Sequence, residues 1–373
     1  MRSSRRPRVR QARDLQESRV GSQYAADLRA AYWAFRRFIA REGGNPLRLG
    51  RSARFANDWL IRYIQSLHDA PAGRIKDARY AILGVQLVHR HHKGALRVAW
   101  DSVKSWQLES PGRHRVPIPE DLMEAASNLC FIMGFVAEPG EARYWVPLGV
   151  LIRAGFHGLL RPSEIYALAT DGIALTSSRI RKTRHGAILT IRDPKNRRSM
   201  GRNQFTIVDD ELTTRWLSWL VEGLPGGVKL FPSTPDRARS LLKRVFDILG
   251  MNLTGFTFGS LRSGGATARY IRDRNIPALR FQGRWKGESS MEPYLQEAVC
   301  ELVAADLGDA ATLVDGLRSL NGLFSSAPSH PWQSFFSRNR QLAGLLRWRT
   351  RMAESASHWH DRFGVSPQSN RLK

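Results

Sequence analysis

The sequence predicts a mainly α-helical protein of two domains, with a small β-sheet in the second domain. Apolar residues recur every three or four positions over most of the chain, whereas the alternation typical of strands is limited to residues 186–208. A proline-rich segment separates two helical regions. A chain of 373 residues is long enough for two domains that each bury a core of their own.

Residues 1–21 are expected to form a flexible basic arm. Seven arginines stand between residues 1 and 20, against Asp14 and Glu17, and no apolar period accompanies them. Such a segment is typical of a DNA-wrapping tail or a nuclear-import signal, although a merely solvated terminus has the same composition.

Residues 22–108 are expected to form a helical domain. Trp59 and Tyr63 belong to an apolar stripe that returns every fourth residue, as on one face of a helix. Breaks rich in glycine and proline at residues 43–46 and 69–71 separate this helix from its neighbours.

Residues 109–119 are expected to be the linker between the domains. The segment holds three prolines and Gly112, together with two arginines, and has few apolar side chains to pack. The domain boundary is therefore placed there.

Residues 120–322 are expected to form the second domain, and residues 323–373 a tail that is only partly ordered. Strands are predicted at 186–192 and 203–208, on either side of the basic turn at 193–198. Helices are predicted over residues 120–137, 145–160, 209–222, 234–249, 260–273 and 289–299.

The charge of the chain indicates a polyanionic partner. There are 58 lysines and arginines against 33 acidic residues, which gives a net charge of +25. Double-stranded DNA is the expected partner, because arginine and lysine release counterions when they neutralise backbone phosphates. An anionic membrane surface would require a basic amphipathic helix or a lipid anchor, and neither is evident, so no membrane partner is expected.

Cysteine and histidine usage argues against disulfides and metal sites. Cys130 and Cys300 are the only cysteines, and they are too few for a disulfide framework. His89, His91 and His92 cluster in sequence but have no carboxylate or cysteine at ligand spacing, so no metal is expected. No apolar run approaches the roughly 18 residues of a membrane span. We therefore expect an intracellular protein, nuclear in a eukaryote and otherwise in the cytoplasm or nucleoid.

Three separated segments combine residues suited to phosphodiester chemistry. Arg161 stands in Gly-Leu-Leu-Arg-Pro-Ser-Glu, with Glu164 three residues later. Arg262 stands in Leu-Arg-Ser-Gly-Gly, and Tyr294 follows Trp285 by nine residues. Two guanidinium forks can hold the non-bridging oxygens of a phosphate under attack without a metal. A phenol needs such a cationic pocket, or a base, to act as a nucleophile.

In these motifs and spacings, over residues 22–300, the chain resembles the tyrosine recombinases, the family of phage-type integrases found in mobile elements. The resemblance implies a SAM-like, core-binding helical domain at 22–108 and an α+β catalytic domain with a three-stranded sheet at 120–322. It implies DNA cleavage and rejoining through a 3′-phosphotyrosine intermediate, for recombination or integration, without metal, ATP or other cofactor. It also implies a homotetramer on paired DNA sites.

The resemblance assigns a role to each motif residue. Tyr294 would be the nucleophile, and Arg161 and Arg262 would hold the phosphate. Trp285 would donate its indole N–H to the phosphate, with core packing as the alternative for this tryptophan and for the tyrosine. Glu164, one helical turn from Arg161, would orient its guanidinium; an ordinary charge at a helix start is the alternative. Surface ion pairs are the alternative for the two arginines.

The remaining assignments concern basic residues. The family takes its general acid from a lysine in a β-hairpin, and Lys195 stands in the expected hairpin turn, with Lys182, Arg197 or Arg198 as alternatives. The expected DNA contacts are Arg179, Arg181, Lys182, Arg184, Arg197, Arg198, Arg284 and Lys286.

The chain departs from the family pattern at Gly259, where the His-x-x-Arg motif has its histidine. The change removes a phosphate donor and a proton shuttle from that position. Two alternatives stay open, the first because of this missing histidine and the second because it uses the same nucleophile chemistry. One is a decayed or domesticated DNA-binding remnant, which would form no covalent adduct. The other is a type IB topoisomerase, which relaxes supercoils without exchanging strands between duplexes.

Overall fold

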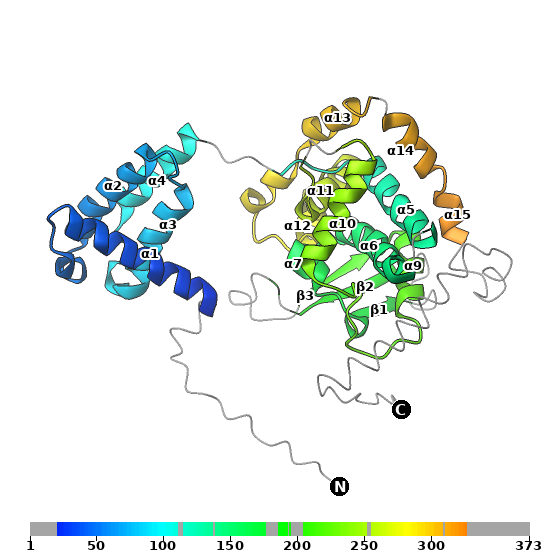
Figure 1. The fold of residues 1–373 in the computed structure, drawn as a ribbon, viewed down its shortest axis with the longest axis horizontal. Coiled ribbons are helices and arrows are strands. Elements are labelled where there is room, and N and C mark those ends of the chain that lie inside the picture. Colours follow the sequence, from blue (N-terminus) through cyan, green and yellow to red (C-terminus); the bar gives the residue numbers. More distant parts are fainter. Residues whose placement is uncertain are drawn as a thin grey trace, which may run out of the picture. The chain divides into compact units, whose positions relative to one another are not determined.

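The computed structural model describes residues 21–110, 115–136, 139–176, 186–192, 194, 204–251, 255–308 and 310–326. The chain divides into two compact units, one ending at residue 113 and one starting at residue 114 (Figure 1). Three segments lie outside the described residues: residues 1–20 of the expected basic arm, the expected basic turn from residue 195, and the expected tail beyond residue 326.

Over residues 21–110 the first unit is a bundle of four helices, each with one buried face. Phe35 and Ile39 of the first helix are fully buried against Leu60 and Ile82 of the second and third. Ser52 caps the second helix, because its hydroxyl accepts a hydrogen bond from a backbone N–H of the first turn. The elements are α1 (Ser22–Arg41), η2 (Pro46–Gly50), α2 (Ala53–Asp69), α3 (Ile75–Val88), η3 (Arg90–His92) and α4 (Arg97–Glu109).

The histidine cluster of the first unit ties its short 3-10 turns together. His91 Nε2 donates to the Gly50 carbonyl at 2.8 Å, and His92 Nε2 donates to the Leu49 carbonyl at 2.7 Å. His89 shares a hydrogen bond of 2.8 Å with the Tyr32 hydroxyl. The contacts of His91 and His92 join η3 to η2, and that of His89 reaches α1. All three rings therefore stabilise the fold of the first unit.

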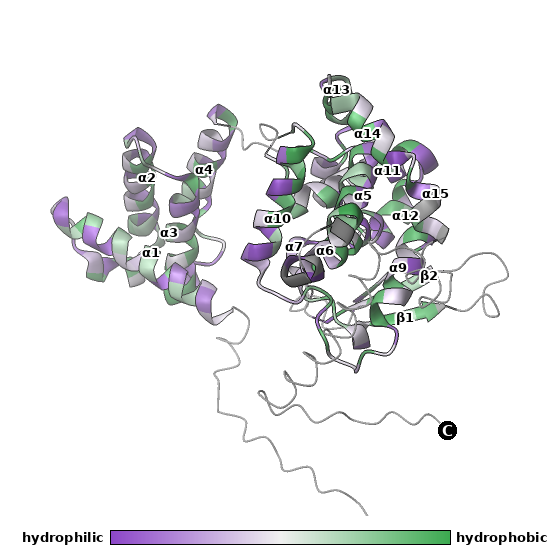
Figure 2. Cartoon of the chain, turned by 45° about the vertical axis from the view of Figure 1, so that its right-hand side comes forward, coloured by the Kyte–Doolittle hydropathy of each residue, from purple (hydrophilic) through white to green (hydrophobic). Residues whose placement is uncertain are grey.

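The second unit is built around the helix pair α5 (Glu120–Val136) and α6 (Pro139–His157). Phe131 of α5 stacks on Trp216, with ring centroids 4.3 Å apart. Polar and apolar bands alternate along α10 (Figure 2), because one face of this helix is buried and the other is exposed. The other helical elements are α7 (Pro162–Tyr166), η4 (Thr170–Gly172), α9 (Glu211–Val221), α10 (Pro235–Ile248), α11 (Phe258–Asp273), α12 (Ile276–Gln282), η5 (Glu288–Ser290), η6 (Glu292–Tyr294), α13 (Glu297–Ala305), α14 (Ala310–Arg318) and α15 (Asn321–Ser326).

A small antiparallel sheet lies at one edge of the second unit (Figure 1). Its strands are β1 (Ile173–Thr176), β2 (Gly186–Ile191) and β3 (Gln204–Val208), in the order β1-β2-β3. Ile188 of β2 faces Ile207 of β3 in the register. The predicted fold class, mainly helical with a small three-stranded sheet, is confirmed. Among the described helices, none has the length and apolar character of a membrane span.

The helix expected over residues 289–299 is a wrong prediction. The 3-10 turns η5 and η6 occupy its first half, and α13 begins only at Glu297. Pro293 explains the difference, because a proline inside an α-helix lacks the N–H of the helical hydrogen bond and clashes with the preceding turn. In addition, the Thr267 hydroxyl contacts the backbone on both sides of Leu295: it donates to the Tyr294 carbonyl and accepts from the Gln296 N–H.

Candidate active site

The three motif segments meet around α11, a helix whose first ten residues are buried. Residues 258–267 of this helix are all buried, and Arg262 lies in their middle. Arg161 stands at the N-cap of α7, whereas Arg284 and Trp285 follow α12 and Tyr294 ends η6. Residues more than 130 positions apart are therefore brought into one cluster.

The helix α11 can reach this depth because two glycines let other backbone segments approach it. A Cβ at Gly264 would lie 2.0 Å from the Ile118 carbonyl oxygen, and a Cβ at Gly265 would lie 2.2 Å from the Phe156 carbonyl oxygen. The glycine pair of the second motif thus packs α11 between the start of the second unit and the end of α6.

The carbonyl of Leu159 is the acceptor that joins two of the arginines. It accepts a hydrogen bond from Arg262 Nη1 and one of 3.2 Å from Arg284 Nη2. Leu159 has a φ of 48°, which is the left-handed region that leucine rarely adopts. Such a conformation costs on the order of 1–3 kcal/mol, and it is found where the surrounding structure requires it, often at functional sites.

Arg262 is an almost completely buried cation. Its exposed fraction is 1%, and its Nη2 donates to the Gly283 carbonyl at 2.5 Å. Its Nε has no hydrogen-bond partner in the described part of the chain. Burial, together with the charges of Arg161 and Arg284, lowers the pKa of Arg262 to about 9. The guanidinium therefore stays protonated at neutral pH.

Glu164 binds two arginines at once. Its Oε1 accepts from Arg161 Nη1 at 2.8 Å, and its Oε2 accepts from Arg284 Nη2 at 2.6 Å. The backbone N–H of Arg161 adds a third hydrogen bond at 2.9 Å. Burial alone would raise the pKa of Glu164, but Arg284 and Arg161 outweigh it and hold the pKa below its ordinary value. The carboxylate is therefore ionised at neutral pH.

Arg284 does not lie on the surface, where a DNA contact was expected. Its side chain is only 5% exposed, and its guanidinium donates to Glu164 and to backbone carbonyls. Its φ of 57° is again left-handed and turns the side chain inward. In this position Arg284 holds Glu164. Lys286, also expected to contact DNA, is exposed.

Trp285 and Tyr294 cover the guanidinium of Arg262. The Arg262 Cζ lies 4.4 Å from the Trp285 ring centroid and 5.3 Å from the Tyr294 ring centroid. Gly283 permits this packing, because a Cβ there would lie 1.7 Å from the Trp285 ring. The indole N–H of Trp285 is buried without a hydrogen-bond partner among the described residues. Tyr294 is partly exposed.

Several expected site residues lie outside the described part of the chain. These are the expected general acid and most of the expected DNA contacts: Lys195, Arg179, Arg181, Lys182, Arg184, Arg197 and Arg198.

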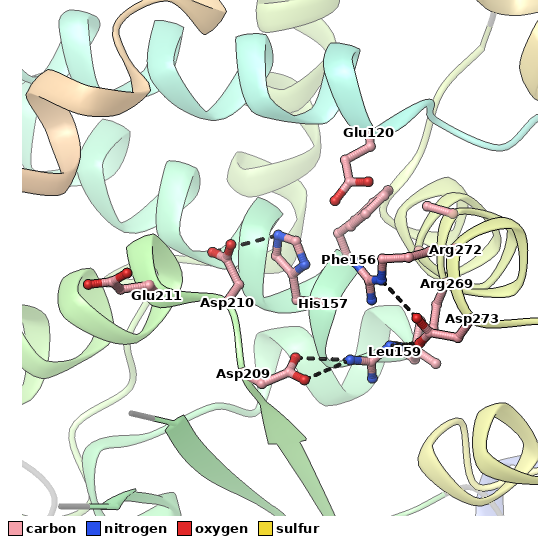
Figure 3. A pocket seen from close by; sticks show the side chains of 12 residues that line it. Glu120, Phe156, His157, Leu159, Asp209, Asp210, Glu211, Arg269, Arg272 and Asp273 are labelled. Atoms are coloured by element: carbon pink, nitrogen blue, oxygen red, sulfur yellow. Dashed lines mark hydrogen bonds and ion pairs between the residues drawn. The ribbon is translucent and has the colours of Figure 1, made fainter. Parts of the chain in front are cut away.

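A pocket of about 340 Å³ lies beside this cluster but contains a different set of side chains (Figure 3). Asp209 accepts two hydrogen bonds of 2.9 Å from Arg269, and Asp210 pairs with the buried Arg153 at 3.1 Å. Burial lowers the pKa of His157 to about 4, so this imidazole is neutral at pH 7. The carboxylates that carry these pairs hold α6, α9 and α11 together.

Sequence reasoning missed two features of the cluster. Leu159 acts through its backbone, and a left-handed leucine has no sequence signature. Arg115, which the sequence places in the linker, lies with its guanidinium against Gly259. In the sequence, only Gly259 indicated that another residue could lie here. A glycine has no side chain, so it leaves space that a residue distant in sequence can fill.

Comparisons with protein-family models and with curated proteins find no match to this chain. Among solved structures, one titled "Crystal structure of XerA recombinase" matches with a TM-score of 0.35 and 13% sequence identity. The match covers 76% of this chain and 97% of that chain. A similarity of this degree does not assign a family.

Proposed function

We propose that the second unit breaks and rejoins a DNA strand by attack of the Tyr294 hydroxyl on a backbone phosphodiester. The observation that supports this most directly is the placement of a tyrosine ring against a buried guanidinium, Arg262, beside two further arginines. Nucleophile and phosphate-binding groups then share one cluster.

The charge of the cluster favours an anionic ligand. The cluster holds three guanidiniums, Arg161, Arg262 and Arg284. Among the described residues its one carboxylate is Glu164, which forms ion pairs with Arg161 and Arg284. A buried charge without a partner is costly, so the excess positive charge is stabilised when an anion binds. The unpartnered N–H groups of Arg262 and Trp285 are donors that such an anion would satisfy.

The reaction would proceed by exchange of one phosphoester for another. The Tyr294 oxygen bonds to phosphorus, the bond from phosphorus to the 5′-oxygen breaks, and a 3′-phosphotyrosyl bond remains. The phenol loses a proton and the 5′-oxygen gains one, so the charge balances. The reverse step rejoins the strand, and no ATP is consumed because the bond energy is kept. We propose Lys195 as the donor of the proton.

Access to Arg262 requires a movement of the segment that carries Tyr294. Arg262 is 1% exposed beneath the rings of Trp285 and Tyr294. The tyrosine stands in a three-residue 3-10 turn, η6, which has fewer internal hydrogen bonds to break than a regular helix. DNA binding would therefore shift η6 and expose the guanidinium to the phosphate.

The test is covalent trapping on DNA. A pool of nicked duplexes of random sequence, in which the released 5′ fragment diffuses away, is incubated with the chain and run on a denaturing gel. We expect a protein–DNA adduct from the wild type and none from Tyr294→Phe, because only the hydroxyl is lost. Affinity for duplex DNA should stay within about threefold, since one hydroxyl adds little to an interface of many phosphates.

Three outcomes separate the alternatives. An adduct from Tyr294→Phe would place the nucleophile elsewhere. DNA binding without an adduct from the wild type would favour a DNA-binding remnant. An adduct together with relaxation of supercoils, but without strand exchange between two duplexes, would favour a topoisomerase.

A further inference from the structure

The space in front of Gly259 is filled by the side chain of Arg115. A Cβ at position 259 would lie 1.9 Å from Arg115 Nη1, 2.7 Å from its Cζ and 2.8 Å from its Cδ. The guanidinium therefore occupies the volume in which a side chain of residue 259 would begin. Gly259 itself lies in the first turn of α11.

The backbone of Arg115 and of the residues that follow it is held against α11 and the N-cap of α13. The Gln296 side chain donates to the Arg115 carbonyl at 3.1 Å. Three residues later, the Ile118 N–H donates to the Ser260 carbonyl at 3.3 Å. The close approach at Gly264 fixes the same segment one turn further along α11. The position of Arg115 is thus set by backbone contacts, while its side chain is exposed.

The charge of Arg115 is available to a ligand. Within the described residues no carboxylate forms an ion pair with it, in contrast to Arg161 and Arg284. Positions 259 and 262 are three residues apart on one helix, so their Cβ positions are separated by about 5–6 Å. The guanidinium of Arg115 therefore lies on the same face of α11 as Arg262.

We propose that Arg115 is a further phosphate-binding residue. Its guanidinium occupies the space that a side chain at position 259 would fill, and it supplies a positive charge to the phosphate there. The inference rests on the proposed function of this site. A guanidinium forms two parallel hydrogen bonds to phosphate oxygens and keeps its proton at every physiological pH. Arg115 therefore stabilises charge on the phosphate and transfers no proton, and the proton for the leaving oxygen comes from another group.

The first test compares the rate of adduct formation at saturating DNA. Arg115→Ala should slow the adduct by a factor on the order of 10², the usual cost of losing one donor to a developing oxyanion. Arg115→Lys should lose about tenfold, because an ammonium keeps the charge without the fork. Lys243→Ala is the matched control, since it removes one exposed cation of α10 away from the cluster. Its adduct rate should equal that of the wild type.

The second test places a histidine at position 259, in the space that Arg115→Ala leaves empty. Arg115→Ala removes the three atoms nearest to a Cβ at position 259, and Gly259→His is then added as a second substitution. The double variant should form adduct about tenfold faster than Arg115→Ala at pH 6, and this gain should vanish as the pH rises through about 6.5, the ordinary pKa of histidine. The wild-type rate should show no matching decline. Melting temperatures of all variants check that each one is folded.

The outcomes distinguish the inference from the function on which it rests. Adduct from the wild type, with Arg115→Ala and Lys243→Ala equally fast, would overturn the inference alone. A double variant that is folded but no faster than Arg115→Ala at any pH would show that position 259 does not face the phosphate. Absence of adduct from the wild type would refute the proposed function, and the inference with it.

Discussion

Replacement of Glu164 by glutamine should destabilise the second unit strongly, because this carboxylate is the counter-charge of two arginines. Glu164→Gln keeps the shape and one acceptor oxygen but removes the negative charge. The side chains of Glu164 and Arg284 are 1% and 5% exposed, and their oxygen and nitrogen lie 2.6 Å apart. Breaking a buried pair of this kind costs about 3–5 kcal/mol, so with one acceptor retained we expect about 2–4 kcal/mol.

The magnitude translates into a measurable change of melting temperature. In a unit of about 150–250 residues, 1 kcal/mol shifts the midpoint by roughly 2–4 °C, so a decrease of about 5–15 °C is expected. Urea unfolding followed by tryptophan fluorescence gives the free energy directly. Glu211→Gln is the control, because its partner Arg215 and Glu211 itself are 38% and 64% exposed, and such surface pairs contribute about 0–1 kcal/mol.

The difference between wild type and Glu164→Gln should also depend on pH. The pKa of Glu164 in the folded chain is below its ordinary value of 4.5. A carboxyl group with a lowered pKa stabilises the fold at any pH above the pKa that it has in the unfolded chain. This stabilisation is lost as the pH falls through the pKa that the group has in the folded chain. The two unfolding free energies should therefore converge from pH 7 toward pH 3. A difference no larger than that of Glu211→Gln, or one that does not change with pH, would refute this account of the cluster.

Three other substitutions test the remaining contacts of the site. Arg161→Lys and Arg262→Lys should each slow adduct formation by a factor on the order of 10² or more, because an ammonium cannot replace the two parallel hydrogen bonds of a guanidinium. A near-normal rate in either variant would show that this arginine does not bind the phosphate. Gly283→Ala should cost about 1–3 kcal/mol by forcing the Trp285 ring from its place. In a Trp285→Ala background the same substitution should cost almost nothing, and equal costs in both backgrounds would contradict the packing described.

The elements that the sequence predicted well are those with a strong local pattern. The strands expected at 186–192 and 203–208 lie at Gly186–Ile191 and Gln204–Val208, because alternation of apolar residues specifies a half-buried strand. The helix expected over 260–273 begins two residues earlier, where Thr257 supplies the cap. By contrast, α12 has only seven residues, too few for a helical period to stand out.

The composition of the cluster was predictable, but the part that each residue takes in it was not. Arg161, Glu164 and Arg262 stand in short sequence motifs, and the spacing of these motifs predicted that the three residues belong to one site. The inward turn of Arg284 depends on a left-handed backbone and on carbonyls supplied from residues 158 and 159. The position of Arg115 depends on how residues 115–119 cross α11. Contacts of this kind arise only from the tertiary fold.

The Leu159 carbonyl, which accepts hydrogen bonds from two arginines, has a consequence for mutagenesis. Its contact with Arg262 and Arg284 is made by a main-chain oxygen, which every amino acid retains. An alanine scan would therefore report only the packing of the leucine side chain and would leave the anchoring acceptor in place. Chemical editing of the polypeptide, with an ester in place of the amide between residues 159 and 160, weakens that oxygen as an acceptor. Semisynthesis, rather than codon replacement, is the method that reaches the atom on which two guanidiniums converge.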